Sequence, residues 1–469
     1  MKNNISKLLI IFSFLTLILT GCVTTKAEPH SIDADCDYLK KILEEASIDV
    51  SKTIDEGLDS AGMIEEIKTE YAELLKNKKP KIILNENGID LQRFAVAIND
   101  AFTKNLTRPN AHISVAGDSF TYVPFVSYVP FFSELVFEKA GDSYVVYSSG
   151  VQEITPGMKY TDEESKLYKT VIDGKECFRF GIFENHFPGK AFVSIEDKMF
   201  DVPVGVYTGP VEQEENFSYK LEDKILKITF NSCMWHTEQE LNRLNEAYEA
   251  IGKLIKEEDI EIVVIDMRRN GGGISTVAYE FACALCGVSD EQKLYELDSY
   301  MGYLSYGAEY INTLTTRTMA AFEGRGTNDL NQSLLANSDS KYVKLFQEYE
   351  AEYIKEFTPE YDGKFILITD WGTASSGETF IGMMKNLFKD KVILAGLNTK
   401  GCLDYANVHT FVLPASRLRV MLSQTDYTHT EMLKPETGWQ GDNRGFFPDY
   451  WFCLTGDLDL QELIEFLRE

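Results

Sequence analysis

Two short segments, each following a run of apolar residues, combine residue types that could support nucleophilic chemistry. The first reads Asp266-Met-Arg-Arg-Asn-Gly-Gly-Gly, and the second reads Thr369-Asp-Trp-Gly-Thr-Ala-Ser-Ser-Gly-Glu. Glycines let backbone N–H groups face a site without a Cβ in the way. A Ser at the start of a helix holds its hydroxyl near oriented N–H groups that can stabilise a developing oxyanion. Taken alone, a glycine run is typical of a tight turn, and a Ser at this place is typical of a helix cap.

Alternating strand and helix patterns surround both segments. Buried-strand patterns occur at 224–230, 260–266, 364–369 and 391–395, and an amphipathic helix is predicted from Thr237 to Lys256. This alternation predicts an α/β fold for residues 216–469, with helices on both faces of a sheet. Residues 289–361 form a Tyr-rich polar insert in this region, which we expect to serve as a lid or a docking surface.

The first half of the chain shows two other patterns. Residues 37–110 repeat apolar positions at helical spacing, which predicts a small helical region. Residues 111–215 contain short β-rich runs separated by Gly and Pro turns, which predicts a small β domain.

The N-terminus has the pattern of an export signal. Lys2 and Lys7 precede an apolar run from Leu8 to Thr20, which is shorter than the ~20 residues that span a bilayer. The sequence Leu19-Thr20-Gly21-Cys22 then resembles a bacterial lipobox, in which the Cys is lipidated and becomes the mature N-terminus. We therefore expect a signal peptide at 1–21, lipidation at Cys22, a tether at 22–36 and an extracytoplasmic, lipid-anchored product.

The charge and the residue spacing of the chain argue against some kinds of partner and cofactor. The 469 residues carry a formal net charge of −28, which disfavours nucleic acid as a partner because the chain would repel a phosphate backbone. No metal-ligand spacing and no phosphate-binding loop is visible, so we expect neither a metal site nor a cofactor. Cys283 and Cys286 have redox or zinc spacing, but they share an apolar helix face, which favours two buried core cysteines.

In this order, the two chemical segments resemble those of the serine peptidases that include C-terminal processing (tail-specific) proteases and the tricorn core protease. Three further segments agree: Thr107-Arg-Pro-Asn-Ala-His, Gly396-Leu-Asn-Thr-Lys-Gly and Asp442-Asn-Arg-Gly-Phe-Phe-Pro-Asp. The resemblance covers about 91–452 and implies a crotonase-like α/β core with protein or peptide substrates. The β-rich domain stands where processing proteases carry a PDZ domain, and is either a degenerate PDZ-like fold or an unrelated one.

Carried over residue by residue, the resemblance makes Ser375 the nucleophile, three residues before Glu378. The oxyanion hole would be the backbone N–H of Ser376 with that of Gly271 or Gly272. Such a site would hydrolyse extracytoplasmic proteins or peptides as an endopeptidase. The alternative is a binding lipoprotein that kept the scaffold and lost catalysis.

The resemblance leaves two candidates for the general base. Processing proteases pair the Ser with a Lys, which points to Lys400, although Lys400 aligns with a residue before the catalytic one. Tricorn-like members use a His, which points to His112. A neutral imidazole can accept a proton near neutral pH, whereas a Lys must first be desolvated, so we favour His112.

Further roles follow from the same resemblance. Asp442 stands where the family has an orienting Glu, and Glu436 is an alternative to it. Arg268 and Arg269 beside the glycines could bind a substrate carboxylate or could support the turn through a salt bridge.

Overall fold

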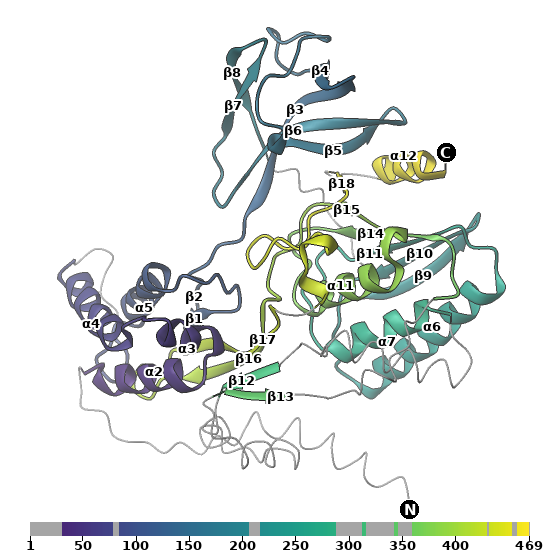
Figure 1. Cartoon of the computed structure of the whole chain (residues 1–469). Helices are drawn as coiled ribbons and strands as arrows, with labels where there is room; N and C mark the ends of the chain where they lie inside the picture. Colours follow the sequence, from purple (N-terminus) through teal and green to yellow (C-terminus); the bar gives the residue numbers. More distant parts are fainter. Residues whose placement is uncertain are drawn as a thin grey trace, which may run out of the picture.

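The computed structural model describes residues 31–77, 84–205, 216–287, 312–315, 342–345, 359–428, 431–452 and 457–468. The chain has a mixed α/β fold, as predicted (Figure 1). Within the described parts, no helix has the length and apolar character needed to cross a membrane. The expected signal peptide, the predicted lipidation site Cys22 and most of the 289–361 insert lie outside the described residues.

A six-stranded sheet forms the centre of the C-terminal half, in the order β18-β15-β14-β11-β10-β9. Its strands run parallel except for β9, which pairs with β10 in an antiparallel hairpin. Their bounds are β9 (Phe217–Glu222), β10 (Ile225–Phe230), β11 (Ile262–Asp266), β14 (Lys364–Thr369), β15 (Val392–Gly396) and β18 (Tyr450–Trp451). The central strands are apolar on both faces because both faces are covered.

Helices cover the two faces of this sheet. Three helices pack on one face with a large apolar core: α6 (Glu238–Glu257), α7 (Ser275–Leu285) and α11 (Ser376–Phe388). Buried Cys286 and partly buried Cys283 of this layer belong to that core. On the other face, α12 (Asp457–Arg468) packs Leu463 and Ile464 against the sheet.

The N-terminal helices share one core with strands from the far end of the sequence. The helices are α2 (Asp33–Glu45), α3 (Ile48–Asp55), α4 (Ser60–Lys76) and α5 (Leu91–Asn105). The strands are β1 (Ser114–Ala116), β2 (Thr121–Tyr122), β16 (Tyr405–Val412) and β17 (Arg419–Asp426), in the order β16-β17-β1-β2. Apolar side chains of all four helices and of β1, β16 and β17 form a continuous buried cluster.

This packing differs from the expected division of the chain in two respects. The sequence pattern assigned 405–426 to the peptidase core, but β17 pairs with β1, β16 pairs with β17, and the N-terminal helices bury the apolar side chains of these strands. The expected tether reached residue 36, but α2 begins at Asp33 and buries the side chain of Cys36. Local patterns cannot tell which distant partner will bury an apolar face.

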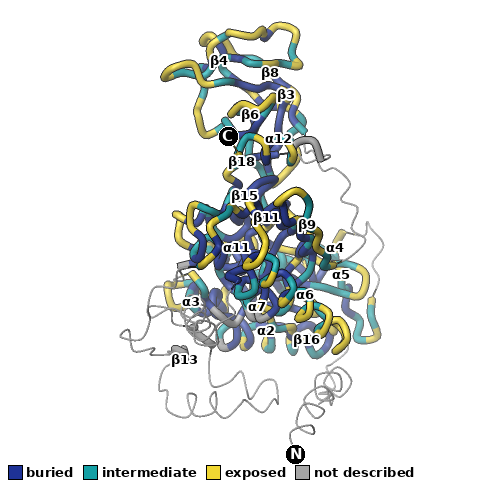
Figure 2. The backbone as a smooth tube through the Cα atoms, turned by 90° about the vertical axis from the view of Figure 1, so that its right-hand side faces the viewer, coloured by how far each residue is buried: buried dark blue, intermediate teal, exposed yellow. Residues whose placement is uncertain are grey.

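The β-rich part stands beyond the rest of the molecule (Figure 2). A four-stranded antiparallel sheet, β4-β3-β6-β5, faces the hairpin β7-β8 across a shared core. The strands are β3 (Val129–Ala140), β4 (Ser143–Ser148), β5 (Leu167–Ile172), β6 (Lys175–Glu184), β7 (Lys190–Ile195) and β8 (Lys198–Pro203). Edge-to-face contacts among Phe132, Tyr168 and Trp451 join this part to the central sheet. Its PDZ-like character stays a prediction.

The insert contributes one described feature. β12 (Asn312–Thr315) and β13 (Tyr342–Leu345) form an antiparallel pair inside it. This pair lies near β16 and β17 (Figure 1). The expected role as a lid or docking surface stays a prediction.

Candidate active site

The two predicted chemical segments meet at the carboxyl ends of neighbouring parallel strands. β11 and β14 pair directly, so the glycine turn after β11 and the Ser turn after β14 lie side by side. Thr373 donates its hydroxyl to the carbonyl of Met267 at 2.8 Å, and Ala374 donates its N–H to the carbonyl of Asn270 at 2.8 Å. The turns thus form one unit at the sheet edge where α/β proteins place their sites.

Asn270 fixes the glycine turn from within. Its side chain is fully buried and donates Nδ2–H to the carbonyl of Phe230 at 2.8 Å. Its Oδ1 accepts the N–H of Gly272 at 3.0 Å. The N–H of Gly272 is therefore engaged, whereas within the described chain no acceptor receives the N–H of Gly271.

Gly272 touches the Ser turn so closely that a side chain cannot fit. A Cβ there would lie 2.7 Å from the carbonyl oxygen of Ala374 and 2.8 Å from Cβ of Ser375. Its φ of +88° is also a conformation that favours glycine. Contact between the two turns therefore depends on this glycine.

Ser375 sits in a strained backbone conformation directly before α11. Its φ of 53° and ψ of −122° are rare for a residue with a side chain, and such strain is typical of functional turns. The next residue, Ser376, opens the helix and donates its hydroxyl to the carbonyl of Gly273 at 3.0 Å. Among the described residues, no acceptor receives the N–H of Ser376. The N–H groups of Ser376 and Gly271 are therefore two donors in these turns that have no acceptor among the described residues.

Glu378 ties the Ser turn to the loop after β15. Its buried carboxylate accepts the N–H of Ser375 at 2.9 Å, of Gly401 at 2.8 Å and of Cys402 at 3.0 Å, and also the hydroxyl of Thr399. Burial raises the pKa of Glu378, and these hydrogen bonds act in the opposite direction. Four donors from two segments thus converge on a single side chain.

His112 lies just before β1, with both its ring and its backbone held. Its Nδ1 is 2.8 Å from the carbonyl oxygen of Tyr405, and its N–H donates to Oδ1 of Asn110 at 2.9 Å. A carbonyl oxygen can only accept, so Nδ1 carries the proton and Nε2 is left as a proton acceptor. Burial lowers the pKa of His112 to about 4, and the positive charge of Lys400 acts in the same direction. The imidazole is therefore neutral near pH 7.

One loop connects the surroundings of Ser375 and His112. The N–H of Ser375 also points to Sγ of Cys402 at 3.2 Å, while His112 bonds the carbonyl of Tyr405. Cys402 and Tyr405 are three residues apart, a stretch of chain that spans at most about 11 Å. The loop thus brings the nucleophile candidate and the imidazole into the same neighbourhood.

Asp442 holds backbone in this region. Its carboxylate accepts the N–H groups of Leu403 at 2.8 Å, Asp404 at 2.9 Å and Ala111 at 3.4 Å. Burial and the adjacent charge of Asp404 raise the pKa of Asp442 well above its usual range. The Tyr405 carbonyl orients the ring of His112 directly. Asp442 acts on the ring only indirectly, because it holds the backbone of Ala111 before His112 and the backbone of Leu403 and Asp404 before Tyr405.

The other predicted residues lie at the margin of the site. The side chain of Lys400 is exposed, and its N–H donates to the carbonyl of Thr373 at 2.9 Å. Glu436 is exposed on a short 3-10 helix. Arg268 forms a salt bridge with Asp266, whose shortest distance is 2.6 Å, so it supports the turn, whereas Arg269 is exposed.

Several residues of the site were missed by sequence reasoning. Tyr405 contributes a backbone carbonyl, which leaves no trace in residue type. Asn270 and Asn110 are buried amides inside segments that drew attention for other residues. Glu378 was noticed for its spacing from Ser375, and its burial could have been inferred from the apolar helix that follows. The described residues contain no group of His, Cys, Asp and Glu suited to hold a metal ion.

Comparison with protein families gives a match to part of the chain. Residues 227–451 match the family model for peptidase family S41. The sequence comparison with curated proteins gave no significant match.

Solved structures with a similar backbone include a lipoprotein from Streptococcus agalactiae, with 17% identity, 54% of this chain and 70% of that chain covered, and a TM-score of 0.30. Mature CPAF complexed with lactacystin has 12% identity, coverage of 92% and 96%, and a TM-score of 0.39. The photosystem II D1 C-terminal processing protease has 12% identity, coverage of 90% and 93%, and a TM-score of 0.36. At such low identities and TM-scores these similarities support no conclusion about chemistry, and the similarity to a known family is confined to residues 227–451.

Proposed function

We propose that this chain, whose residues 227–451 match the model for peptidase family S41, is a serine endopeptidase that cleaves extracytoplasmic proteins or peptides through an acyl-enzyme on Ser375. The observation that carries this proposal is the contact between the strained Ser375 turn and Gly272. That contact places a hydroxyl, a helix N-terminus and a glycine turn at one point.

In the proposed reaction, Oγ of Ser375 attacks the carbonyl carbon of the scissile peptide bond. Its proton passes to Nε2 of His112, which is neutral and directed by the Tyr405 carbonyl. The imidazolium then gives the proton to the leaving amine, and the Ser375 ester remains. Water hydrolyses this ester by the same two proton transfers.

The oxyanion would be bound by the N–H groups of Ser376 and Gly271. The helix that begins at Ser376 adds the positive end of its dipole. The N–H of Gly272 is bonded to Oδ1 of Asn270 and would not bind the oxyanion. Gly272 contributes because its lack of a side chain lets the two turns come into contact. Removing one oxyanion donor typically lowers kcat by about 10²–10³-fold.

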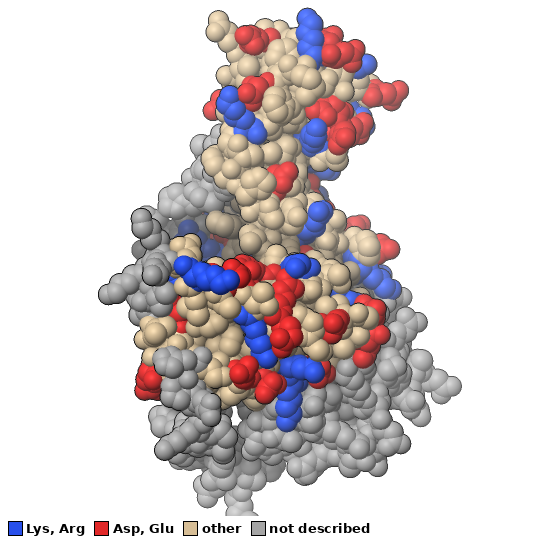
Figure 3. Space-filling model, turned by 90° about the vertical axis from the view of Figure 1, so that its left-hand side faces the viewer, with Lys and Arg blue, Asp and Glu red and all other residues tan. Residues whose placement is uncertain are grey.

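The lipobox-like sequence supports an extracytoplasmic, lipid-anchored location for this peptidase. The acidic composition supports protein or peptide partners over nucleic acid. On the face shown in Figure 3, acidic and basic side chains are interspersed, and the described residues visible there form no continuous basic area.

Replacement of Ser375 tests the proposal. Wild type should hydrolyse unfolded protein substrates and react with a serine-directed phosphonate, and Ser375→Ala should do neither while remaining folded. Equal hydrolysis by both proteins would show that Ser375 is not the nucleophile. If the folded wild type neither hydrolyses nor reacts, the binding lipoprotein is the better account, because covalent labelling requires an activated hydroxyl.

A further inference from the structure

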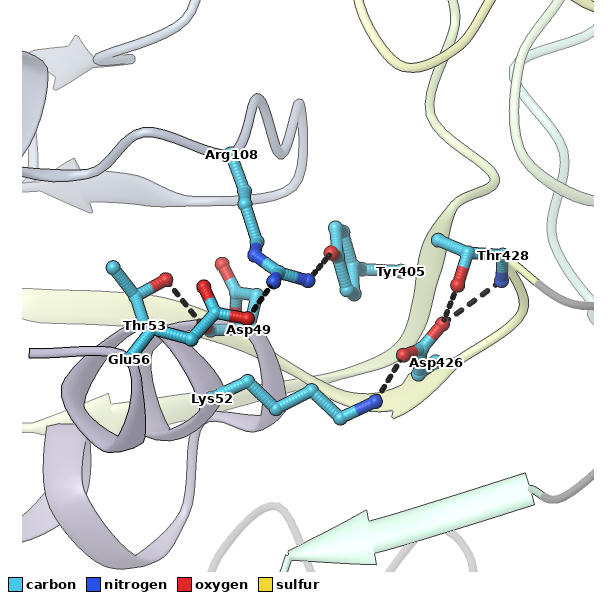
Figure 4. Close-up of polar contacts among 8 residues, drawn as sticks. All are labelled: Asp49, Lys52, Thr53, Glu56, Arg108, Tyr405, Asp426 and Thr428. Atoms are coloured by element: carbon cyan, nitrogen blue, oxygen red, sulfur yellow. Dashed lines mark hydrogen bonds and ion pairs between the residues drawn. The ribbon is translucent and has the colours of Figure 1, made fainter.

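Helix α3 packs its polar residues against the elements that carry His112. In Figure 4, Asp49, Lys52, Thr53 and Glu56 from this helix and its C-terminal end lie next to Arg108 and to residues of β16 and β17. Lys52 forms an ion pair with Asp426, the last residue of β17. The helix is thus attached by charge, as well as by its apolar side, to the region around the imidazole.

A buried chain of hydrogen bonds leads from α3 to the backbone of His112. Asp49 is almost fully buried, and its Oδ2 accepts Nδ2–H of Asn110 at 3.1 Å. Asn110 is fully buried, and its Oδ1 accepts the N–H of His112 at 2.9 Å. Ser47 holds the other oxygen of Asp49 at 2.8 Å, and Ser423 of β17 lies 3.2 Å from Nδ2 of Asn110. The amide of Asn110 therefore has a fixed orientation, because Asp49 can only accept at the contact with Nδ2.

A second connection reaches the ring of His112. The carbonyl of Tyr405 orients Nδ1 of His112, and the Tyr405 hydroxyl lies 3.5 Å from a guanidinium nitrogen of Arg108. Arg108 also forms an ion pair with Glu56, the C-cap residue directly after α3. The backbone and the ring of His112 are thus both linked to the same helix, and Figure 4 shows the part of the second connection from Tyr405 through Arg108 to Glu56.

We propose that Asn110, oriented by Asp49 of α3, is a positioning residue that sets the direction of Nε2 of His112 toward Ser375. This inference rests on the proposed function, in which His112 is the general base. A proton transfer requires a donor and acceptor within hydrogen-bond reach, and a misplacement of 1 Å can lower a rate by roughly 10²-fold. In this arrangement the N-terminal helical region supplies part of the catalytic geometry.

Exchanging donor and acceptor between residues 49 and 110 tests the hydrogen-bond chain. Asn110→Asp alone places two carboxylates in contact, and Asn110→Ala removes all hydrogen bonds of the amide, including those to Asp49 and to the N–H of His112. Each should lower kcat for a peptide substrate by about 10- to 100-fold with little change in KM, because binding does not involve the imidazole. The double variant Asp49→Asn with Asn110→Asp restores a donor at 49 and an acceptor for the N–H of His112. It should recover most of the lost kcat.

Asp35→Asn provides a matched structural control. Asp35 lies in α2, is fully buried and accepts the N–H groups of Ala415 and Ser416, with no bond to the His112 segment. This variant should lower the unfolding midpoint and leave kcat of the folded protein near the wild-type value. This control shows whether a lower kcat in the Asn110 variants comes from lower stability of the protein or from misalignment of His112.

Two results would overturn the inference. One is a folded Asn110→Ala variant with wild-type kcat, and the other is a double variant that folds like wild type without regaining kcat. If Asn110→Ala does not fold, the double variant decides. Ser375→Ala and His112→Ala are measured alongside, and wild-type hydrolysis by either would instead refute the proposed function.

Discussion

His112 and Tyr405 are joined by a hydrogen bond of 2.8 Å between the imidazole Nδ1 and a backbone carbonyl oxygen. In a Ser-His-carboxylate triad, a carboxylate orients the imidazole and stabilises its charged form. A neutral carbonyl also orients the imidazole, but it stabilises the charged form less than a carboxylate does. Burial lowers the pKa of His112 and the charge of Lys400 acts in the same direction, while the hydrogen bond to the Tyr405 carbonyl opposes them only in part, which leads to the first prediction.

Hydrolysis should stay constant across the neutral range and fall only in acid. Protonation of Nε2 removes the base, so kcat/KM should decline as the pH drops through the His112 pKa of about 4 and not through the ordinary value of 6.5. Initial rates between about pH 3.5 and 9 check this. A lowered folded-state pKa also means that stability falls as the pH drops below 6.5, so circular dichroism is needed at each pH. A midpoint at or above neutrality would contradict the assignment.

Lys400→Ala should leave hydrolysis at pH 8 nearly unchanged, because the exposed Lys400 side chain is not the proposed base. Its charge contributes to the lowered pKa of His112, so its removal should shift the acid limb of the pH profile to higher pH. His112→Ala, by contrast, should abolish hydrolysis. The opposite pattern, with Lys400 indispensable and His112 dispensable, would identify a Ser-Lys enzyme.

Gly272→Ala should lower kcat at least roughly 10²-fold, because the new Cβ would collide with the turn that carries Ser375. Gly205→Ala is the control, since a Cβ at Gly205 would meet nothing within 4 Å. The measurement is hydrolysis per folded molecule, with the folded fraction determined by denaturant titration. Equal activity of the two variants would mean that the contact between the turns is dispensable.

Glu378→Gln should lower both stability and activity. An amide cannot accept from all four donors that now surround the carboxylate, and leaving a buried donor unpaired lowers the unfolding free energy by about 1–3 kcal/mol. The rate of phosphonate labelling should fall as well, because the Ser375 N–H and the 399–402 loop lose their common partner. Glu436→Gln changes an exposed carboxylate and should alter stability by no more than about 0.5 kcal/mol. Indistinguishable variants would argue against this role of Glu378.

Cys22→Ser should release the protein from membranes without changing its peptidase activity, because lipidation of a lipobox requires the thiol. Detergent-phase partitioning of wild type and variant measures the anchor, and a peptide assay on both fractions measures activity. Continued partitioning of the variant into detergent would exclude Cys22 as the lipid attachment site.

The sequence by itself determined those parts of the protein whose interactions are local. The apolar runs of β11 and β14, the glycines after Asn270 and the small residues around Ser375 predicted two strand ends with turns suited to an oxyanion site. Whether a segment forms a strand or a turn depends largely on residues close to it in the sequence, so these features could be predicted without knowing the tertiary structure.

Only the tertiary structure decided how distant segments share the site. β17 pairs with β1, which lies about three hundred residues earlier in the sequence, and β16 pairs with β17. This sheet brings the Tyr405 carbonyl to His112. A backbone carbonyl has no residue type, so its role cannot be predicted from spacing. The choice between Gly271 and Gly272 likewise depends on the Asn270 side chain, and the pKa of His112 depends on burial by several segments. Burial, hydrogen-bond partners and charge all arise from residues far apart in the sequence, and they exist only once the chain has folded.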